Sequence, residues 1–246
     1  MWHPRLRILM LALAAALALP QSARADAMLS HFSYPHEVQS FVFQSQGLTL
    51  SMAYMDIKPA RPNGKTVVLL HGKNFCGATW GGVISALTEA GYRAVVPDQI
   101  GFCKSDKPLN FAFGMHELAA NTHQLLQALK IERPIVAGHS MGGMLAMRYA
   151  LSFPEALSGL VLINPIGLED WRSKGVPERT LDELLASERK TDAARIKAYQ
   201  QAVHYDGKWK PAYDQWVDMP ASMYAGADRE IVVRAQALAS RMIFSD

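Results

Sequence analysis

The stretch PIVAGHSMGG, residues 134–143, runs from four apolar residues directly into a glycine-rich turn. The turn has the pattern G-x-S-x-G, in which Gly138 and Gly142 flank Ser140 and Gly143 follows. Where a strand turns sharply into a helix, the central residue is strained and the residues two positions away have almost no room for a side chain. Gly143 would let the helix pack close to the strand. The stretch therefore predicts a strand, a tight turn and a helix.

A serine at the centre of such a turn is a candidate nucleophile. The Ser140 hydroxyl would project beside the start of the helix at Met141, where free N–H groups and the helix dipole favour the negative charge of acyl transfer. A turn used only for packing is the alternative interpretation. A dinucleotide-binding loop is disfavoured because the spacing is G-x-x-x-G-G, not G-x-G-x-x-G.

Strands and helices alternate along the chain on both sides of this turn. Strict alternation predicts right-handed crossovers and a doubly wound, mostly parallel sheet of the α/β class, with helices on both faces. The first two runs read as an antiparallel hairpin. Strand-like runs cover residues 38–44, 48–55, 65–70, 92–97, 134–137 and 157–164, and helical patterns cover residues 80–90, 115–129 and 141–152.

The pattern changes after residue 164. Residues 165–246 contain amphipathic helical stretches rich in Trp and Tyr, and no convincing strand. Aromatic residues at helical spacing are more typical of packing than of a ligand site. We therefore predict an α/β core over residues 26–164 and an all-helical cap over residues 165–246.

The first 25 residues resemble a targeting segment. They contain three arginines and no acidic residue, and two of the arginines precede an apolar run at residues 8–19. Small residues then offer A-x-A cleavage points. This arrangement is typical of a secretory signal peptide, and the run is too short for a membrane-spanning helix. We expect cleavage after Ala25, no membrane span in the mature protein, and a secreted or periplasmic location; a retained anchor is the alternative.

Charge and cysteine content exclude several classes of function. The net charge is +3, and without the first 25 residues 22 basic residues face 22 acidic ones. With no basic excess, nucleic acid is not an expected partner. Two cysteines are too few for a disulfide framework or a Cys-based zinc site, and no metal site is expected.

Three motifs together resemble the α/β-hydrolase superfamily, and specifically its serine hydrolases with a helical cap. The resemblance extends over residues 38–246. Each motif follows a predicted strand, as expected for loops at one edge of a parallel sheet. The motifs are His71-Gly72 after the third strand, DQIGFCKS at residues 98–105 after the fourth, and residues 138–143 after the fifth.

This resemblance implies a role for several residues. Ser140 would be the nucleophile, and the backbone N–H groups of Lys73 and Met141 would form the oxyanion hole. His71 and His139 occupy positions that are structural in this fold. The implied substrate is a small-molecule ester or related acyl compound, cleaved without a cofactor.

The catalytic acid and base are harder to assign. The family orders its triad as Ser, acid, His. His204 is the only histidine after Ser140 in the sequence, and its place between cap helices predicts a surface or packing role, so we do not assign it as the base. Glu169 and Asp170 follow the sixth strand, where some members hold the acid, but helix capping or surface charge explains them as well. We therefore expect the front part of an enzyme, with its last strands, acid and base beyond residue 246, and with the apolar run 160–163 at an unpaired sheet edge.

Two questions stay open from the sequence. Cys76 and Cys103 follow neighbouring strands, and in an oxidising compartment they could form a disulfide at the rim of the site or stay as buried thiols. The predicted function is a serine hydrolase. The alternatives are an inactive truncated product and a hydrolase-like module that binds a small molecule under the cap.

Overall fold

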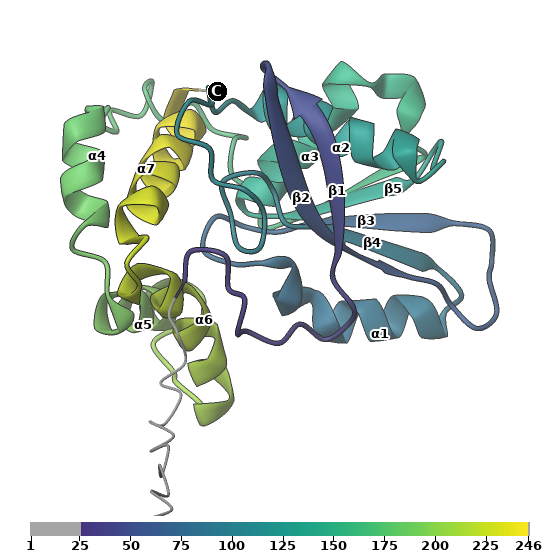
Figure 1. Ribbon diagram of the computed structural model, residues 1–246, viewed down its shortest axis with the longest axis horizontal. Helices are drawn as coiled ribbons and strands as arrows, with labels where there is room; N and C mark the ends of the chain where they lie inside the picture. The colour runs from purple at the N-terminus through teal and green to yellow at the C-terminus, as the bar shows by residue number, and fades with distance from the viewer. Residues whose placement is uncertain (1–25, 246) are drawn as a thin grey trace, which may run out of the picture.

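The computed structural model describes residues 26–245, so the predicted signal peptide lies outside the described residues. Within this range six strands form one sheet in the order β1-β2-β4-β3-β5-β6 (Figure 1). The order confirms the predicted α/β class. The strands are β1 (Gln39–Ser45), β2 (Leu48–Ile57), β3 (Thr66–Leu70), β4 (Arg93–Pro97), β5 (Ile135–His139) and β6 (Gly159–Ile163).

The sheet is antiparallel at one edge and parallel elsewhere. β1 and β2 form the predicted hairpin, and its two turn residues, Gln46 and Gly47, have φ of 50° and 75°. Positive φ at both positions is typical of the two-residue turns whose twist matches that of the strands. β2 also pairs antiparallel with β4, whereas β4, β3, β5 and β6 pair in parallel.

Helices cover both faces of the sheet, as predicted. In Figure 1, α1 (Gly81–Glu89) lies below the sheet, and α2 (Met115–Ala128) and α3 (Met141–Ser152) lie above it. β3 and β4 are buried along nearly their whole length, which explains their continuous apolar sequences. The helix predicted over residues 80–90 is a 3-10 turn at Gly77–Trp80 followed by α1. The Asp98 carboxylate accepts the Gly77 N–H at 2.7 Å and holds the start of this turn.

The residues after β6 form helices only, at one side of the molecule (Figure 1). α4 begins with a capping box in which Thr180 and Glu183 exchange hydrogen bonds. Met219, Met223 and Val232 of these helices belong to the same apolar cluster as residues of β3. We refer to these helices as the cap, and the division into domains at residue 164 stays a prediction. The helices are α4 (Leu181–Glu188), α5 (Ala193–Val203), α6 (Asp214–Ala225) and α7 (Arg229–Ser245).

β6 lies at the edge of the described sheet, where it pairs with β5 alone. Leu160, Val161 and Ile163 are 39%, 44% and 38% exposed. This confirms the expectation that an apolar strand would stand at an edge of the sheet, an arrangement that invites association with other strands. None of the helices in residues 26–245 is long and apolar enough to cross a membrane.

Candidate active site

Ser140 stands at a strained turn between β5 and α3. Its φ of 54° and ψ of −118° lie outside the regions that ordinary residues populate, at a cost of about 1–3 kcal/mol. The surrounding backbone holds this conformation. The Ser140 N–H donates to Ile163 O at 3.1 Å, and the Ser140 carbonyl accepts from Gly143, Met144 and Ile166 at 2.9, 3.2 and 3.3 Å. The side chain does not cap the helix and is partly exposed.

The three glycines of the turn are needed because backbone or a rigid ring fills the space around each. A Cβ at Gly138 would lie 1.9 Å from the carbonyl oxygen of Gly142. A Cβ at Gly142 would lie 2.1 Å from Leu70 O at the end of β3, and one at Gly143 would lie 2.7 Å from Pro165 Cβ. Contacts this short with backbone cannot be relieved by rotating a side chain. The spacing G-x-S-x-G-G therefore has the steric origin that the sequence predicts.

The loop after β3 lies directly beside Ser140. A Cβ at Gly72 would be 3.3 Å from Ser140 Cβ and 3.2 Å from His139 Nδ1. Lys73 is the next residue of this loop, and Met141 is the first residue of α3, so its N–H has no acceptor within the helix. The structure thus brings the predicted nucleophile close to the loop and helix that carry the two predicted oxyanion donors.

His71 is held on both sides of its ring. It is 1% exposed, Nε2 accepts the Gln99 N–H at 3.0 Å, and Nδ1 lies 2.9 Å from Gly72 O. In the neutral ring Nδ1 is then the donor. Burial lowers the pKa of His71 below its ordinary value, which favours this neutral form. Both nitrogens bind backbone, in keeping with a structural role.

His204 lies where the cap meets the core. Its ring packs edge-on against Phe75 and Tyr199, with centroids 5.1 and 5.7 Å apart, and it lies 6.3 Å from the ring of His139. Within residues 26–245 its buried Nε2 has no hydrogen-bond partner. Burial lowers the pKa of His204, and the nearby His139 lowers it further. Neither ring is hydrogen-bonded to the Ser140 hydroxyl, and His204 packs as the sequence predicts.

The two acidic residues after β6 are exposed and locally engaged. Glu169 pairs with Lys174 at 3.1 Å, and the Asp170 carboxylate accepts the Arg172 N–H at 3.0 Å. These contacts match the alternative of surface charge; neither residue caps a helix, because the described chain forms bends and turns here.

Cys76 and Cys103 form a disulfide, with Cα atoms 5.8 Å apart, which settles the alternative left open by the sequence. It joins the loops that follow β3 and β4. Cys103 has φ of 49°, a left-handed conformation that glycine adopts more readily than other residues. Asp98 lies close to both sulfurs. However, the sulfurs are bonded to each other and the Asp98 carboxylate accepts hydrogen bonds from Gly77, Tyr34 and Lys104, so this group is not free to bind a metal.

A cavity of about 320 Å³ lies between the cap and the two loops. Its lining combines apolar and aromatic side chains with polar ones, among them the charged groups of Lys73, Glu188 and Arg195. Such a mixture is typical of a site for a small organic molecule. The apolar and aromatic lining includes Phe75, Phe102, Ile196, Tyr199, Pro220 and Met223.

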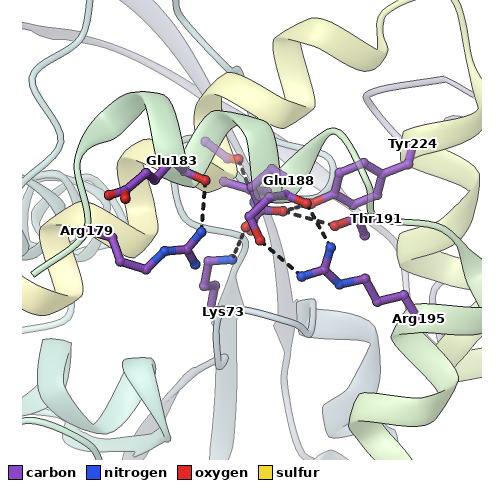
Figure 2. A network of polar contacts seen from close by, with 10 residues as sticks. Lys73, Arg179, Glu183, Glu188, Thr191, Arg195 and Tyr224 are labelled. Atoms are coloured by element: carbon purple, nitrogen blue, oxygen red, sulfur yellow. Dashed lines mark hydrogen bonds and ion pairs between the residues drawn. The ribbon is translucent and has the colours of Figure 1, made fainter. Parts of the chain in front are cut away.

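One polar network in this cavity joins the core to the cap (Figure 2). Lys73 Nζ lies 2.9 Å from Glu188 Oε1, and the Tyr224 hydroxyl donates to Glu188 Oε2 at 2.8 Å. Burial alone raises the pKa of Glu188, but the Lys73 ammonium and hydrogen bonds from Lys73, Tyr224 and Thr191 outweigh it, so the pKa lies below its ordinary value. Glu188 could not be singled out from the sequence, because nothing in the sequence links residues 115 positions apart.

The strand order, the strained serine turn and the helical cap define the α/β-hydrolase class. A family model described as alpha/beta hydrolase fold matches residues 65–232, and the chain belongs to this family. Among solved structures, it is similar to a probable hydrolytic enzyme of Pseudomonas aeruginosa. The two are 50% identical with a TM-score of 0.88, over 90% of this chain and 71% of the other.

Curated relatives match over a shorter region. A 2-hydroxy-6-oxo-6-phenylhexa-2,4-dienoate hydrolase of Comamonas testosteroni is 35% identical over 43% of this chain and 38% of its own length. A cis-3-alkyl-4-alkyloxetan-2-one decarboxylase of Xanthomonas campestris is 35% identical over 47% of this chain and 40% of its own length. The chain thus spans less than half the length of these relatives.

Proposed function

We propose that this protein is an exported serine hydrolase that cleaves esters or related acyl compounds, with Ser140 as its nucleophile. The observation that carries the proposal is the strained turn that presents the Ser140 hydroxyl beside the loop of Lys73 and the start of α3. Family membership supports a hydrolytic activity, because the similar proteins include named hydrolases. The fold hosts several chemistries, so the acyl class rests on the serine and its surroundings.

In the proposed reaction Ser140 Oγ attacks the substrate carbonyl carbon and its proton passes to a general base. The N–H groups of Lys73 and Met141 hold the negative oxygen of the tetrahedral intermediate. The intermediate collapses to an acyl-enzyme, and the leaving alkoxide takes up the proton. Water then attacks the acyl carbon and releases the acid. The family's order of nucleophile, acid and His assigns the base to a segment later than the sixth strand.

Replacement of the nucleophile tests the proposal. Ser140→Ala should reduce hydrolysis of p-nitrophenyl esters about 10³-fold or more, and it should abolish labelling by a fluorophosphonate probe. Ser85→Ala is the matched control, because Ser85 lies on an exposed face of α1 and only bonds the backbone of its own helix. Full activity in the Ser140 variant would contradict the proposal.

A module that binds a small molecule without cleaving it is the second candidate. It is favoured by the fact that no histidine of residues 26–245 is hydrogen-bonded to Ser140, and by the cavity of about 320 Å³. An unreactive Ser140 together with tight binding of an ester analogue would support this candidate.

Export is supported by the signal-like first 25 residues and by the disulfide, because disulfides persist in oxidising compartments. The mass of the protein recovered from a periplasmic or culture fraction should correspond to cleavage after Ala25. A cytoplasmic protein that retains residue 1 would contradict export.

A further inference from the structure

The loop that carries the Lys73 amide is tied at its two ends, and between them the Phe75 ring packs against the rings of His139 and His204. At one end the His71 ring binds the Gln99 backbone, and at the other Cys76 is tied to Cys103. Between them Phe75 N–H bonds Gly72 O and closes a turn. Within the described residues, the Lys73 side chain makes one polar contact outside this loop, the ion pair with Glu188.

The Lys73–Glu188 pair is largely shielded from water. The two side chains are 18% and 14% exposed, and their charged atoms are 2.9 Å apart. An ion pair in such surroundings is screened less than one at the surface, and the loss of one partner leaves the other charge without compensation. Removal of Glu188 would therefore leave the Lys73 ammonium without a partner in a largely buried position.

The cap holds the Glu188 carboxylate in a fixed position. Tyr224 of α6 donates to Oε2 at 2.8 Å, and Thr191 Oγ1 lies 3.4 Å from the same oxygen (Figure 2). Arg229 of α7 donates to the carbonyl oxygens of Arg189 and Thr191 at 2.7 and 2.9 Å, which secures the chain just after Glu188. Three segments of the cap thus present one anion to the loop.

We propose that Glu188 is a positioning residue for the oxyanion hole: by holding the Lys73 side chain, it sets the orientation of the Lys73 N–H. The inference rests on the proposed function. Oxyanion donors act only when they lie about 2.7–3.1 Å from the developing charge, and a displacement of about 1 Å can lower the rate about 100-fold. The oxyanion hole is then complete only when the cap is packed against the core.

Glu188→Gln tests this with little change in volume. Its matched control is Glu230→Gln, which removes a neighbouring cap ion pair, Arg189–Glu230, that is more than half exposed and does not reach the loop. We expect amide hydrogen exchange in residues 72–76 to become about tenfold faster in the Glu188 variant and to stay unchanged in the control. Unchanged exchange in the Glu188 variant would overturn the proposal.

The kinetic measurement separates positioning from general stability. Glu188→Gln should lower kcat about 10-fold to 100-fold with KM within about twofold, and it should weaken a trifluoromethyl ketone analogue of the transition state by a similar factor. Lys73→Met, which keeps the backbone amide, should reproduce both effects and serves if the first variant folds poorly. A change in KM alone would overturn the proposal.

The two proposals fail in different ways. Hydrolysis that survives Ser140→Ala refutes the proposed function, whatever the exchange data show. Ser140-dependent hydrolysis that is unaffected by both Glu188→Gln and Lys73→Met refutes the positioning role alone.

Discussion

A methyl group added at Gly142 tests whether the close approach of α3 to β3 is what forms the serine turn. The new Cβ would lie 2.1 Å from Leu70 O and 2.7 Å from His71 O, whereas ordinary contact begins at 3.4 Å. Both oxygens belong to the backbone at the end of a buried strand. The start of α3 must therefore move by more than an ångström, and it carries Ser140 and Met141 with it.

The size of the effect follows from two opposing contributions. Alanine is favoured over glycine inside a helix by about 0.5–1 kcal/mol. Overpacking of a close-packed site costs about 1–3 kcal/mol, and the upper end applies because the contacts are with backbone. We expect Gly142→Ala to lower the free energy of unfolding by about 2–2.5 kcal/mol. For a chain of this size, Tm should fall by about 4–10 °C.

Gly82→Ala is the matched control. Gly82 is the second residue of α1, as Gly142 is of α3, and a Cβ there would meet nothing within 4 Å. This variant should equal the parent or gain up to about 1 kcal/mol. Unfolding of both variants is followed by circular dichroism in heat and in urea. Equal midpoints for the two variants would refute the steric explanation of the turn.

Three further outcomes are expected. Replacing Cys76 and Cys103 by Ser should lower the free energy of unfolding by about 3.5 kcal/mol, from a sequence separation of 27, and denaturation with and without reductant measures this. Thr180→Ala removes the capping box of α4 and should lower the free energy of unfolding by about 1 kcal/mol; an unshifted Tm would show that this capping box does not stabilise the fold. Burial lowers the pKa of both His139 and His204, so the folded state favours the neutral rings. The stability that the neutral rings contribute is fully present above about pH 6.5, the ordinary pKa of histidine, and is lost as the pH falls toward the lower folded-state pKa values. The urea midpoints at pH 7.5 and 5.5 should therefore differ less in His204→Gln than in the parent protein.

The sequence predicts the core because its signals are local. The apolar run at β3 and the spacing of Gly138, Ser140 and Gly142 each reflect a steric or burial demand within a few residues of chain. All six strands of the described sheet were predicted, with ends that shift by one or two residues. End residues depend on hydrogen bonds with neighbouring strands, which periodicity does not contain.

The contacts between the cap and the core could not be predicted. Thr180 and Glu183 are recognisable as a helix start, but Glu188 has the same sequence context as any charge on a helix surface. Its partner Lys73 becomes visible only once α4 has been placed over the loop. For Cys76 and Cys103, topology brought the two loops together, but only the observed separation decides between a disulfide and free thiols.

The position of the disulfide matters for inhibitor design. Both cysteines line the cavity between the cap and the loops that follow β3 and β4. In protein produced in a reducing host, two thiols would face the same space that an electrophilic inhibitor enters, and a thiolate reacts with many such warheads. Selectivity profiles collected on reduced material would then report sulfur alkylation as well as reaction at the serine hydroxyl.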